Sequence, residues 1–438
     1  MKKLSFTQKM IVSLVLGVAI GLGFLWIRHT ADAGTWSIID NLLFKDITAE
    51  GATDAIGLFF IGGKIFINLL QLVIVPMVFT SITLAMVHIT DTKKLGRISF
   101  KTIKGFLITS IAALFFASLV GYTLMQANLF AVEGLEIATA QTKVGGNPLS
   151  IILSVFPNNL VAAFSTNTGV LAVVFLAVVL GLILNQFPEL ATIKKLIEEM
   201  NKVISVFLHF IIQKFAPICV FLLLVRTFAS YGINYLKPAA VYMIATAITL
   251  FLFLVFGYAL FVRLFAKVNP MPFVQKINKV AIFGFSTSSS AATLPLNMQV
   301  TEEELGVEKD ICSFTLPLGM TINMNGTAIM QVIATVFVAS SAGYTLSFTN
   351  ILTVSVLALI ASVGTPAAPG AGAVILFTIL SGMGYVNDAA LATYALILAI
   401  NRPIEMLVTC LNVVGDSATA VYVAASEGTL NKNVYHQK

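Results

Sequence analysis

Six apolar segments of membrane-spanning length precede Asn269, and they constrain the fold more than any other feature of the 438-residue sequence. An α-helix needs about 20 mostly apolar residues to cross a bilayer. Hydrophobic residues make up 58% of the chain and charged residues only 11%, which is unlike a soluble domain. We therefore expect an all-α polytopic membrane protein with spans near residues 10–27, 56–87, 103–125, 148–184, 203–229 and 239–266.

The fourth of these segments is longer than one span requires. It is interrupted by FPNN (156–159) and STNTG (165–169). A broken helix frees backbone groups that lipid cannot satisfy, so its pieces must contact protein or water. We expect several helical pieces, either a kinked helix packed on its neighbours or part of a site.

Basic residues gather between the apolar segments. They are Lys2, Lys3 and Lys9, then Lys93, Lys94, Arg97 and Lys101, then Lys194, Lys195 and Lys202, and finally Lys267, Lys276 and Lys279. By the positive-inside rule, both termini are expected in the cytoplasm and the protein in the inner membrane, with a retained first helix. The net charge of +6 then needs no nucleic-acid partner. Cys219, Cys312 and Cys410 lie in apolar sequence without metal-ligand spacing and are expected to be buried.

Two interrupted segments follow in the second half. They are GFSTSSSAATLPLNMQV (284–300) and SVGTPAAPGAGAVILF (362–377), and no charged residue occurs from Ile311 to Asn387. Short apolar arms around a polar or proline-rich centre fit a hairpin that enters the membrane part-way and returns. Two such segments, each followed by a long helix, indicate inverted repeats with a site near the bilayer midplane.

Between the hairpins, the stretch SFTLPLGMTINMNGTAIM (313–330) places amides beside a glycine at membrane depth. An unwound turn there would expose the carbonyls of Gly319, Thr321 and Asn323 to a small hard cation. The carboxylate of Asp416 would balance its charge. We therefore expect a sodium site.

A polar stripe runs along the last apolar segment, residues 391–425. Asn401, Glu405, Thr409, Asn412 and Asp416 stand at offsets of 0, 4, 8, 11 and 15, and these offsets share one face of a helix. Because unpartnered charges are costly in lipid, this face must contact protein, water or ions.

Together these motifs resemble the dicarboxylate/amino acid:cation symporter family, which includes the glutamate transporters. The resemblance covers nearly the whole chain and rests on SSSAATLP, NMNGT, GTPAAPGAG and NVVGD in combination. It implies eight transmembrane helices plus two re-entrant helical hairpins in inverted repeats, an elevator-type mechanism and a homotrimer in contact with membrane lipid. The family is itself a known example of inverted-repeat transporters.

The resemblance also divides the chain into two parts. Residues 1–99 (helices 1 and 2) and 128–236 (helices 4 and 5) would form a scaffold. Residues 100–127 (helix 3) and 237–438 would form a transport domain. The latter would contain helix 6, hairpin 1 at about 272–300, helix 7 at about 308–338, hairpin 2 at about 348–383 and helix 8 at about 387–425.

Site residues follow from the same resemblance. One sodium would be bound by Gly319, Asn323, Asn412 and Asp416, and a second by Thr321, Ser362, Val363 and Thr365. The substrate residues would be Ser288, Ser289, Ser290, Thr327, Ala368, Gly372, Glu405, Val408, Thr409 and Asn412. Among these, Ser290, Thr327 and Asn412 would bind the α-carboxylate, and Glu405 the amino group. From the residues alone, the serines are also explained by helix capping or helix packing.

Several positions depart from the family pattern. Val408 stands where relatives that carry acidic amino acids have an arginine. Asn325 and Asn401 replace aspartates, which puts a third sodium site in question, together with its candidate ligands Thr109 and Ser110 on helix 3. Arg402 could supply the missing guanidinium, although pairing with Glu405 or an exposed position are plainer interpretations.

The expected function is sodium-coupled symport of a small amino acid, with no cofactor besides the coupling ions. The apolar Val408 favours a neutral zwitterion, because an unpaired carboxylate there would be costly. The alternative is sodium- or proton-coupled uptake of acidic amino acids or C4-dicarboxylates. A channel would need a continuous polar pore, and an enzyme is disfavoured because the sequence has no HExxH or GxSxG motif.

Overall fold

The computed structural model describes residues 6–48, 52–87, 93–132, 153, 155–165, 170–363, 365 and 370–437, and all regular secondary structure within these ranges is helical. The first half contains α1 (Phe6–Thr30), α2 (Ala33–Ile39), η1 (Asp40–Phe44), α3 (Leu58–Val87), α4 (Lys93–Gln126), α6 (Leu160–Phe164), α7 (Val170–Gln186), η3 (Pro188–Leu190), α8 (Ala191–Phe210), η4 (Ile211–Phe215), α9 (Ala216–Tyr231) and η5 (Gly232–Tyr235). The second half contains α10 (Leu236–Leu252), η6 (Phe253–Gly257), α11 (Tyr258–Phe261), η7 (Val262–Ala266), α12 (Pro270–Thr287), α13 (Ser290–Gln299), η8 (Val300–Glu304), α14 (Lys309–Ile322), α15 (Asn325–Ser341), α16 (Phe348–Val363), α17 (Ala371–Met383), α18 (Asp388–Ile400), α19 (Arg402–Glu427) and α20 (Lys432–His436).

Seven helices in the described part of the chain are long and apolar enough to cross a membrane. They are Gln8–Thr30, Leu58–Val87, Gly96–Gln126, Pro188–Ser230, Leu236–Ala266, Lys309–Ser341 and Arg402–Glu427. The prediction of an all-α polytopic membrane protein is confirmed at this level, whereas the number of eight spans stays a prediction. The long fourth segment is divided as expected, because α6 follows an irregular FPNN stretch and Asn159 caps its N-terminus.

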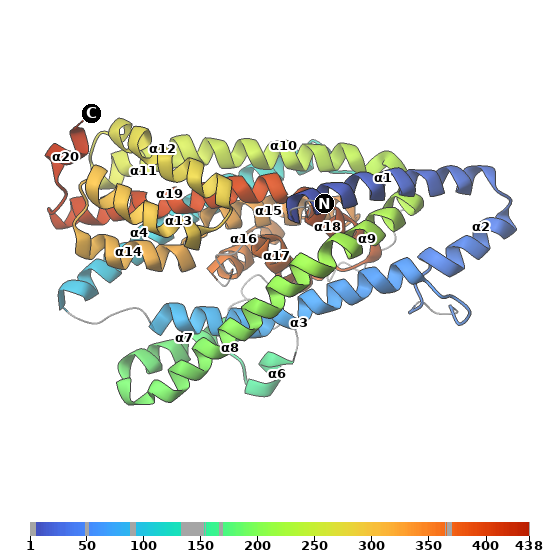
Figure 1. Cartoon of the computed structure of the whole chain (residues 1–438), viewed down its shortest axis with the longest axis horizontal. Coiled ribbons are helices and arrows are strands. Elements are labelled where there is room, and N and C mark those ends of the chain that lie inside the picture. The colour runs from blue at the N-terminus through green and yellow to red at the C-terminus, as the bar shows by residue number, and fades with distance from the viewer. Residues whose placement is uncertain are drawn as a thin grey trace, which may run out of the picture.

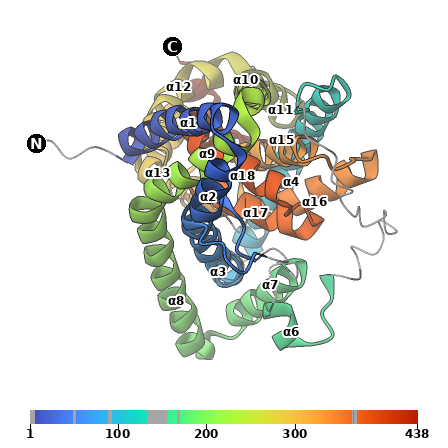
Figure 2. The same ribbon diagram turned by 90° about the vertical axis from the view of Figure 1, so that its right-hand side faces the viewer.

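Two groups of helix contacts can be followed in Figure 1, and they are joined by the packing of α9 on α18 and of α3 on α17. In one group α1 packs on α9, and α3 packs on α7, α8 and α9. In the other, α4 leaves its sequence neighbours and packs on α14, α15, α16 and α19. Figure 2 shows α8 running away from the body of the molecule. The predicted basic connection of Lys194, Lys195 and Lys202 lies within this helix.

Both interrupted segments fold as pairs of packed helices. The arms α12 and α13 meet at Ser288, whose φ of +50° reverses the chain, and α16 packs on α17. The long helix between the pairs is broken after Ile322 and resumes at Asn325, at the NMNGT motif. That each helix pair enters the membrane part-way and returns to the same side stays a prediction.

The segment expected as one helix over 387–425 is instead divided at Asn401 into α18 and α19. Pro403 explains the division, because it has no N–H to donate to the carbonyl four residues earlier. Asn401 therefore lies at a break in the helix, not within it.

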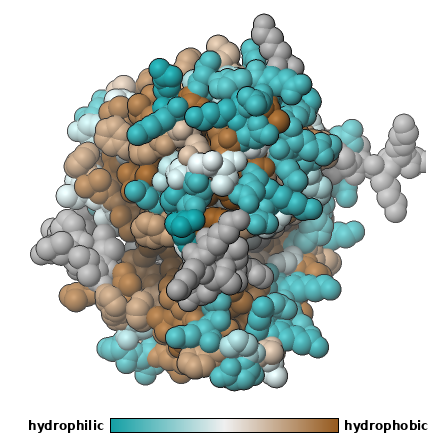
Figure 3. All heavy atoms as spheres, turned by 90° about the vertical axis from the view of Figure 1, so that its left-hand side faces the viewer, coloured by the Kyte–Doolittle hydropathy of each residue, from teal (hydrophilic) through white to brown (hydrophobic). Residues whose placement is uncertain are grey.

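The C-terminal segment closes over the base of the first helix pair. The ammonium of Lys276 on α12 donates to the backbone carbonyls of Glu304, Val434 and Tyr435 at 2.8, 2.7 and 3.0 Å. The fully buried Tyr435 donates its hydroxyl to the carbonyl of Asn269 at 2.8 Å. This end of the molecule, seen face-on in Figure 3, carries mostly hydrophilic side chains with hydrophobic ones beside them.

Lys276→Met is expected to destabilise the protein by about 1–3 kcal/mol, because it leaves these carbonyls without their shared donor. Thermal unfolding of the detergent-purified protein should show a lower melting temperature. Lys279→Met is the matched control, since Lys279 is 64% exposed and its described ion pair, with Glu304, lies at the surface. Equal shifts for the two variants would contradict this role of Lys276.

Candidate cation and substrate site

Three segments converge near the middle of α19. The α12 glycine Gly284 lies against Val413, so that a Cβ there would be 2.9 Å from the valine side chain. At the start of α15, a Cβ on Gly326 would be 2.7 Å from the carbonyl oxygen of Val408. In α17, the corresponding distance from Gly372 to the Thr327 methyl group is 3.3 Å. The tip of the first helix pair, the break in α14–α15 and the start of α17 are thereby brought together.

Asp416 and Asn323 form the buried polar centre of this region. The Asn323 amide nitrogen donates to Asp416 Oδ1 at 2.8 Å. Gly319 lies so close to the Asp416 carboxylate that any Cβ would collide with it. Among the described residues, Asn323 Oδ1 is buried without a hydrogen-bond partner. A carboxylate beside an unused carboxamide oxygen, at the C-terminal end of α14, offers the oxygen ligands that a hard cation prefers.

Asn412 connects α19 to the start of α15 instead of joining Asp416 directly. Its Oδ1 accepts the Gly326 N–H at 2.7 Å, and its Nδ2 donates to Thr327 Oγ1 at 3.3 Å. Nδ2 also lies 3.2 Å from the sulfur of Met324. Two residues assigned by resemblance to the α-carboxylate, Asn412 and Thr327, are therefore neighbours.

Asn325 is held by hydroxyl groups from two other helices. Ser110 donates to its Oδ1 at 2.6 Å, while its Nδ2 donates to Thr109 at 3.0 Å and to Tyr258 at 3.1 Å. The structure thus brings Thr109 and Ser110 to Asn325, while a third sodium site at these residues stays a prediction. A neutral amide occupies the centre of the group and uses both its oxygen and its nitrogen.

The serines of the first helix pair have distinct positions. Ser288 is the left-handed residue after α12, and in the described chain its buried hydroxyl has no hydrogen-bond partner. Ser289 is the N-cap of α13 and accepts the Ala292 N–H at 3.3 Å. Ser290 begins α13 and is buried. The capping interpretation is confirmed for Ser289.

Two residues of the second predicted sodium site are joined by a backbone hydrogen bond, in which the Thr365 N–H donates to the Ser362 carbonyl at 3.0 Å. The hydroxyls of Thr321, Ser362 and Thr365 donate to the carbonyls of Leu318, Leu359 and Ala361, in their own helical segments, at 2.8–2.9 Å. Val363 ends α16, which packs on α14. Ala368 lies outside the described residues. This site stays a prediction.

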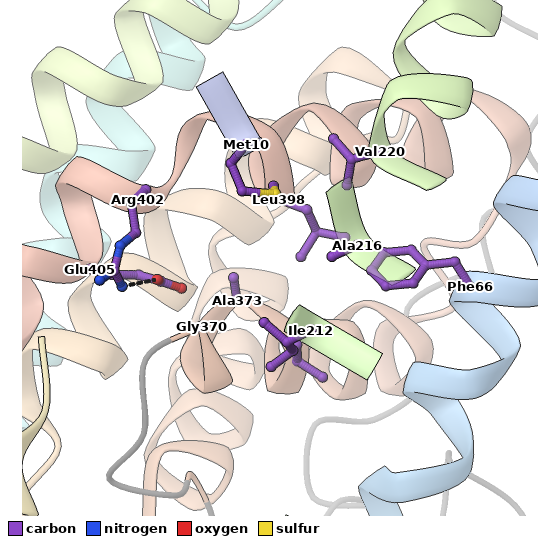
Figure 4. A pocket seen from close by; sticks show the side chains of 11 residues that line it. Met10, Phe66, Ile212, Ala216, Val220, Gly370, Ala373, Leu398, Arg402 and Glu405 are labelled. Atoms are coloured by element: carbon purple, nitrogen blue, oxygen red, sulfur yellow. Dashed lines mark hydrogen bonds and ion pairs between the residues drawn. The ribbon is translucent and has the colours of Figure 1, made fainter. Parts of the chain in front are cut away.

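Glu405 lines a cavity of about 40 Å³ together with Arg402. The two side chains point toward each other (Figure 4), and Arg402 Nη1 lies 3.5 Å from Glu405 Oε2. The wall of the cavity includes Gly370 and Ala373 at the start of α17. The plainer interpretation of Arg402, pairing with Glu405, is confirmed. Val408 and Thr409, farther along α19, are buried.

The polar stripe of α19 is shared among several partners. Asn401, at its start, accepts the hydroxyl of Tyr242 on α10 at 2.8 Å. Farther along, the Ser417 hydroxyl donates to Asn297 Oδ1 of α13 and lies 2.9 Å from the Thr301 hydroxyl of η8. Sequence reasoning missed these partners, as it missed Tyr258 and Met324. Only Ser417, which follows Asp416 directly, carried a signal, since it is a polar residue in an apolar helix.

Comparison of the sequence with known proteins finds transporters. A profile described as the Sodium:dicarboxylate symporter family matches residues 6–426. The Proton/glutamate-aspartate symporter of Escherichia coli (strain K12) is 28% identical over 449 residues, covering 97% of this chain and 93% of the relative. The C4-dicarboxylate transport protein of Deinococcus deserti is 29% identical and covers 83% of each chain. The Proton/sodium-glutamate symport protein of Bacillus caldotenax is 28% identical, over 84% of this chain and 88% of its own.

Proposed function

Because this chain belongs to the sodium:dicarboxylate symporter family, it is a secondary transporter of the membrane and not an enzyme, and we propose that it carries small carboxylate anions together with sodium. The substrates would be acidic amino acids or C4-dicarboxylates. The observation that carries the proposal is the buried Asn323–Asp416 pair, adjacent to the Asn412–Thr327 pair across one broken helix.

The cation is proposed to bind at Asp416. A buried carboxylate needs a compensating charge, and the described contacts of Asp416 include an amide but no cationic side chain. The unused Asn323 Oδ1 and the last carbonyls of α14 would complete an oxygen shell with Gly319 and Asn412 nearby. Thr321, Ser362, Val363 and Thr365 are proposed for a second sodium.

The substrate is proposed to bind between Ser290, Thr327, Gly372 and the α19 face from Glu405 to Asn412. A neutral substrate, the prediction based on Val408, has less support, because the three relatives above are named for glutamate, aspartate or C4-dicarboxylates. The guanidinium of Arg402, which shares a cavity with Glu405, also weakens the argument from an apolar wall.

The transport cycle is proposed to use two moving parts. The packing of α4 on α14, α15, α16 and α19 supports a transport domain of residues 100–127 and 237–438 beside a scaffold of 1–99 and 128–236. We propose eight spans with two re-entrant hairpins in inverted repeats, an elevator movement, a homotrimer, and both termini on the cytoplasmic side of the inner membrane. The second hairpin would close once sodium and substrate are bound.

Uptake by purified protein in proteoliposomes tests the function. An inward sodium gradient is expected to drive accumulation of radiolabelled L-aspartate or succinate, and replacement of sodium by choline should stop it. Accumulation driven by a proton gradient alone would contradict sodium coupling. No accumulation under either gradient would contradict symport of these substrates. Stronger inhibition by L-serine than by L-aspartate would favour the neutral substrate.

A further inference from the structure

Arg402 is the cationic side chain of the cavity in Figure 4. It comes from the first turn of α19 and shares the cavity with Glu405, Gly370 and apolar side chains of α1, α3 and α9. Its side chain is 18% exposed, and its ion pair is a single contact of 3.5 Å with Glu405. The buried Nε has no hydrogen-bond partner among the described residues.

The guanidinium therefore has N–H donors that its contact with Glu405 does not use. It carries five N–H groups in a planar fork that fits a carboxylate with two parallel hydrogen bonds. Glu405 balances the charge of Arg402, but one long contact does not occupy the fork. Because unsatisfied buried donors are costly, a carboxylate ligand that filled the fork would be bound favourably.

We infer that Arg402 binds the distal carboxylate of the transported substrate while Glu405 binds its ammonium group. The inference rests on the proposed function and narrows it to acidic amino acids. Along α19, Arg402, Glu405, Thr409 and Asn412 follow one another about one turn apart. This order of guanidinium, carboxylate, hydroxyl and carboxamide matches a distal carboxylate, an ammonium and an α-carboxylate taken in succession.

The two charges discriminate among the candidate substrates. A C4-dicarboxylate has no ammonium, so it would bring anionic charge to the Glu405 carboxylate. A neutral amino acid would leave the Arg402 fork unfilled. An acidic amino acid supplies both complementary charges. Its binding to Arg402 and Glu405 therefore requires no cationic side chain at the position of Val408.

Binding requires the start of α17 to move. The cavity of about 40 Å³ has room for about one water molecule, not for a four-carbon substrate. Gly370 and Ala373 form its wall beside Glu405. When this end of α17 moves away from α19, Arg402 exchanges its contact with Glu405 for the substrate carboxylate.

The test compares L-aspartate with its neutral isostere L-asparagine, in proteoliposomes of wild type and Arg402 variants. Arg402→Gln is expected to raise the apparent KM for aspartate by about ten- to a hundredfold, the loss of a charged hydrogen-bonded contact. The KM for asparagine should change by less than about threefold. Arg402→Lys keeps the charge beside Glu405 but lacks the fork, so it should fold normally with an intermediate aspartate KM. Arg263→Gln, at an exposed arginine of η7, is the matched control and should change neither KM.

Aspartate-dependent thermal stabilisation of the purified protein provides a readout without any gradient. Stabilisation of wild type that is lost in Arg402→Gln supports the inference even if uptake fails and the proposed function falls. Equal stabilisation of both proteins, or equal losses for aspartate and asparagine in a folded Arg402→Gln variant, would overturn it. Succinate that competes as well as aspartate in wild type would overturn the assignment of the ammonium to Glu405.

Discussion

Asp416→Asn is expected to weaken sodium activation of transport by more than about a hundredfold. Among the described residues of the buried cluster with Asn323 and Gly319, Asp416 carries the charge, so its removal takes away the charge proposed to bind the cation. Removing one partner of a buried charge pair costs about 3–5 kcal/mol, which corresponds to at least a hundredfold in affinity. Initial uptake rates in proteoliposomes at increasing sodium concentration measure the effect.

Stability separates a lost ligand from a damaged fold. Without sodium, Asp416→Asn should be at least as stable as wild type, because a buried charge has become a neutral amide. Sodium should then stabilise wild type against heat but not the variant. Asp388→Asn is the control, since the Asp388 carboxylate at the start of α18 is 46% exposed and pairs with Arg226 of α9. An unchanged sodium dependence in Asp416→Asn would exclude Asp416 as a ligand.

Gly319→Ala is expected to weaken sodium activation by about tenfold or more through geometry alone. The new methyl group would occupy the position of the Asp416 carboxylate and would lie 3.0 Å from the Phe106 ring. In a helix interior, alanine is more favourable than glycine by about 1 kcal/mol, so the substitution should not weaken α14 itself. The expected result is a folded protein with a displaced carboxylate, measured by the sodium dependence of uptake and of thermal stability.

Gly382→Ala provides the matched comparison. This glycine of α17 would bring its Cβ no closer than 3.4 Å to Leu357, an ordinary contact distance. Its sodium dependence should therefore equal that of wild type. The interpretation of Gly319 fails if both variants behave alike or if Gly319→Ala keeps the wild-type sodium affinity.

The elements around the site were largely predictable, because each leaves a local signal in the sequence. A run of hydroxyls between apolar arms indicated the turn at Ser288, and NMNGT indicated the break after Ile322. Asn323 and Asp416 were also paired correctly, since polar groups at membrane depth must find each other. The division at Asn401 was missed, although Pro403 carried the signal for it.

Other partners left no local signal. Tyr258 and Tyr242 look like ordinary aromatic residues of apolar helices, and only packing places their hydroxyls on Asn325 and Asn401. Likewise, a lone lysine such as Lys276 does not indicate in sequence that distant backbone carbonyls will surround it.

By itself, the sequence determined the membrane class, the two interrupted segments, the broken helix and the residue types of the cation cluster. These follow from hydrophobicity, helix-breaking residues and the cost of polar groups in lipid, all of which act within short stretches of chain. The tertiary structure decided most of the contacts between polar groups of different helices. It joined Ser110 to Asn325, divided the α19 stripe among its neighbours, and placed the start of α17 against the Arg402–Glu405 pair. Such contacts depend on how separate helices pack, and no single helix encodes them.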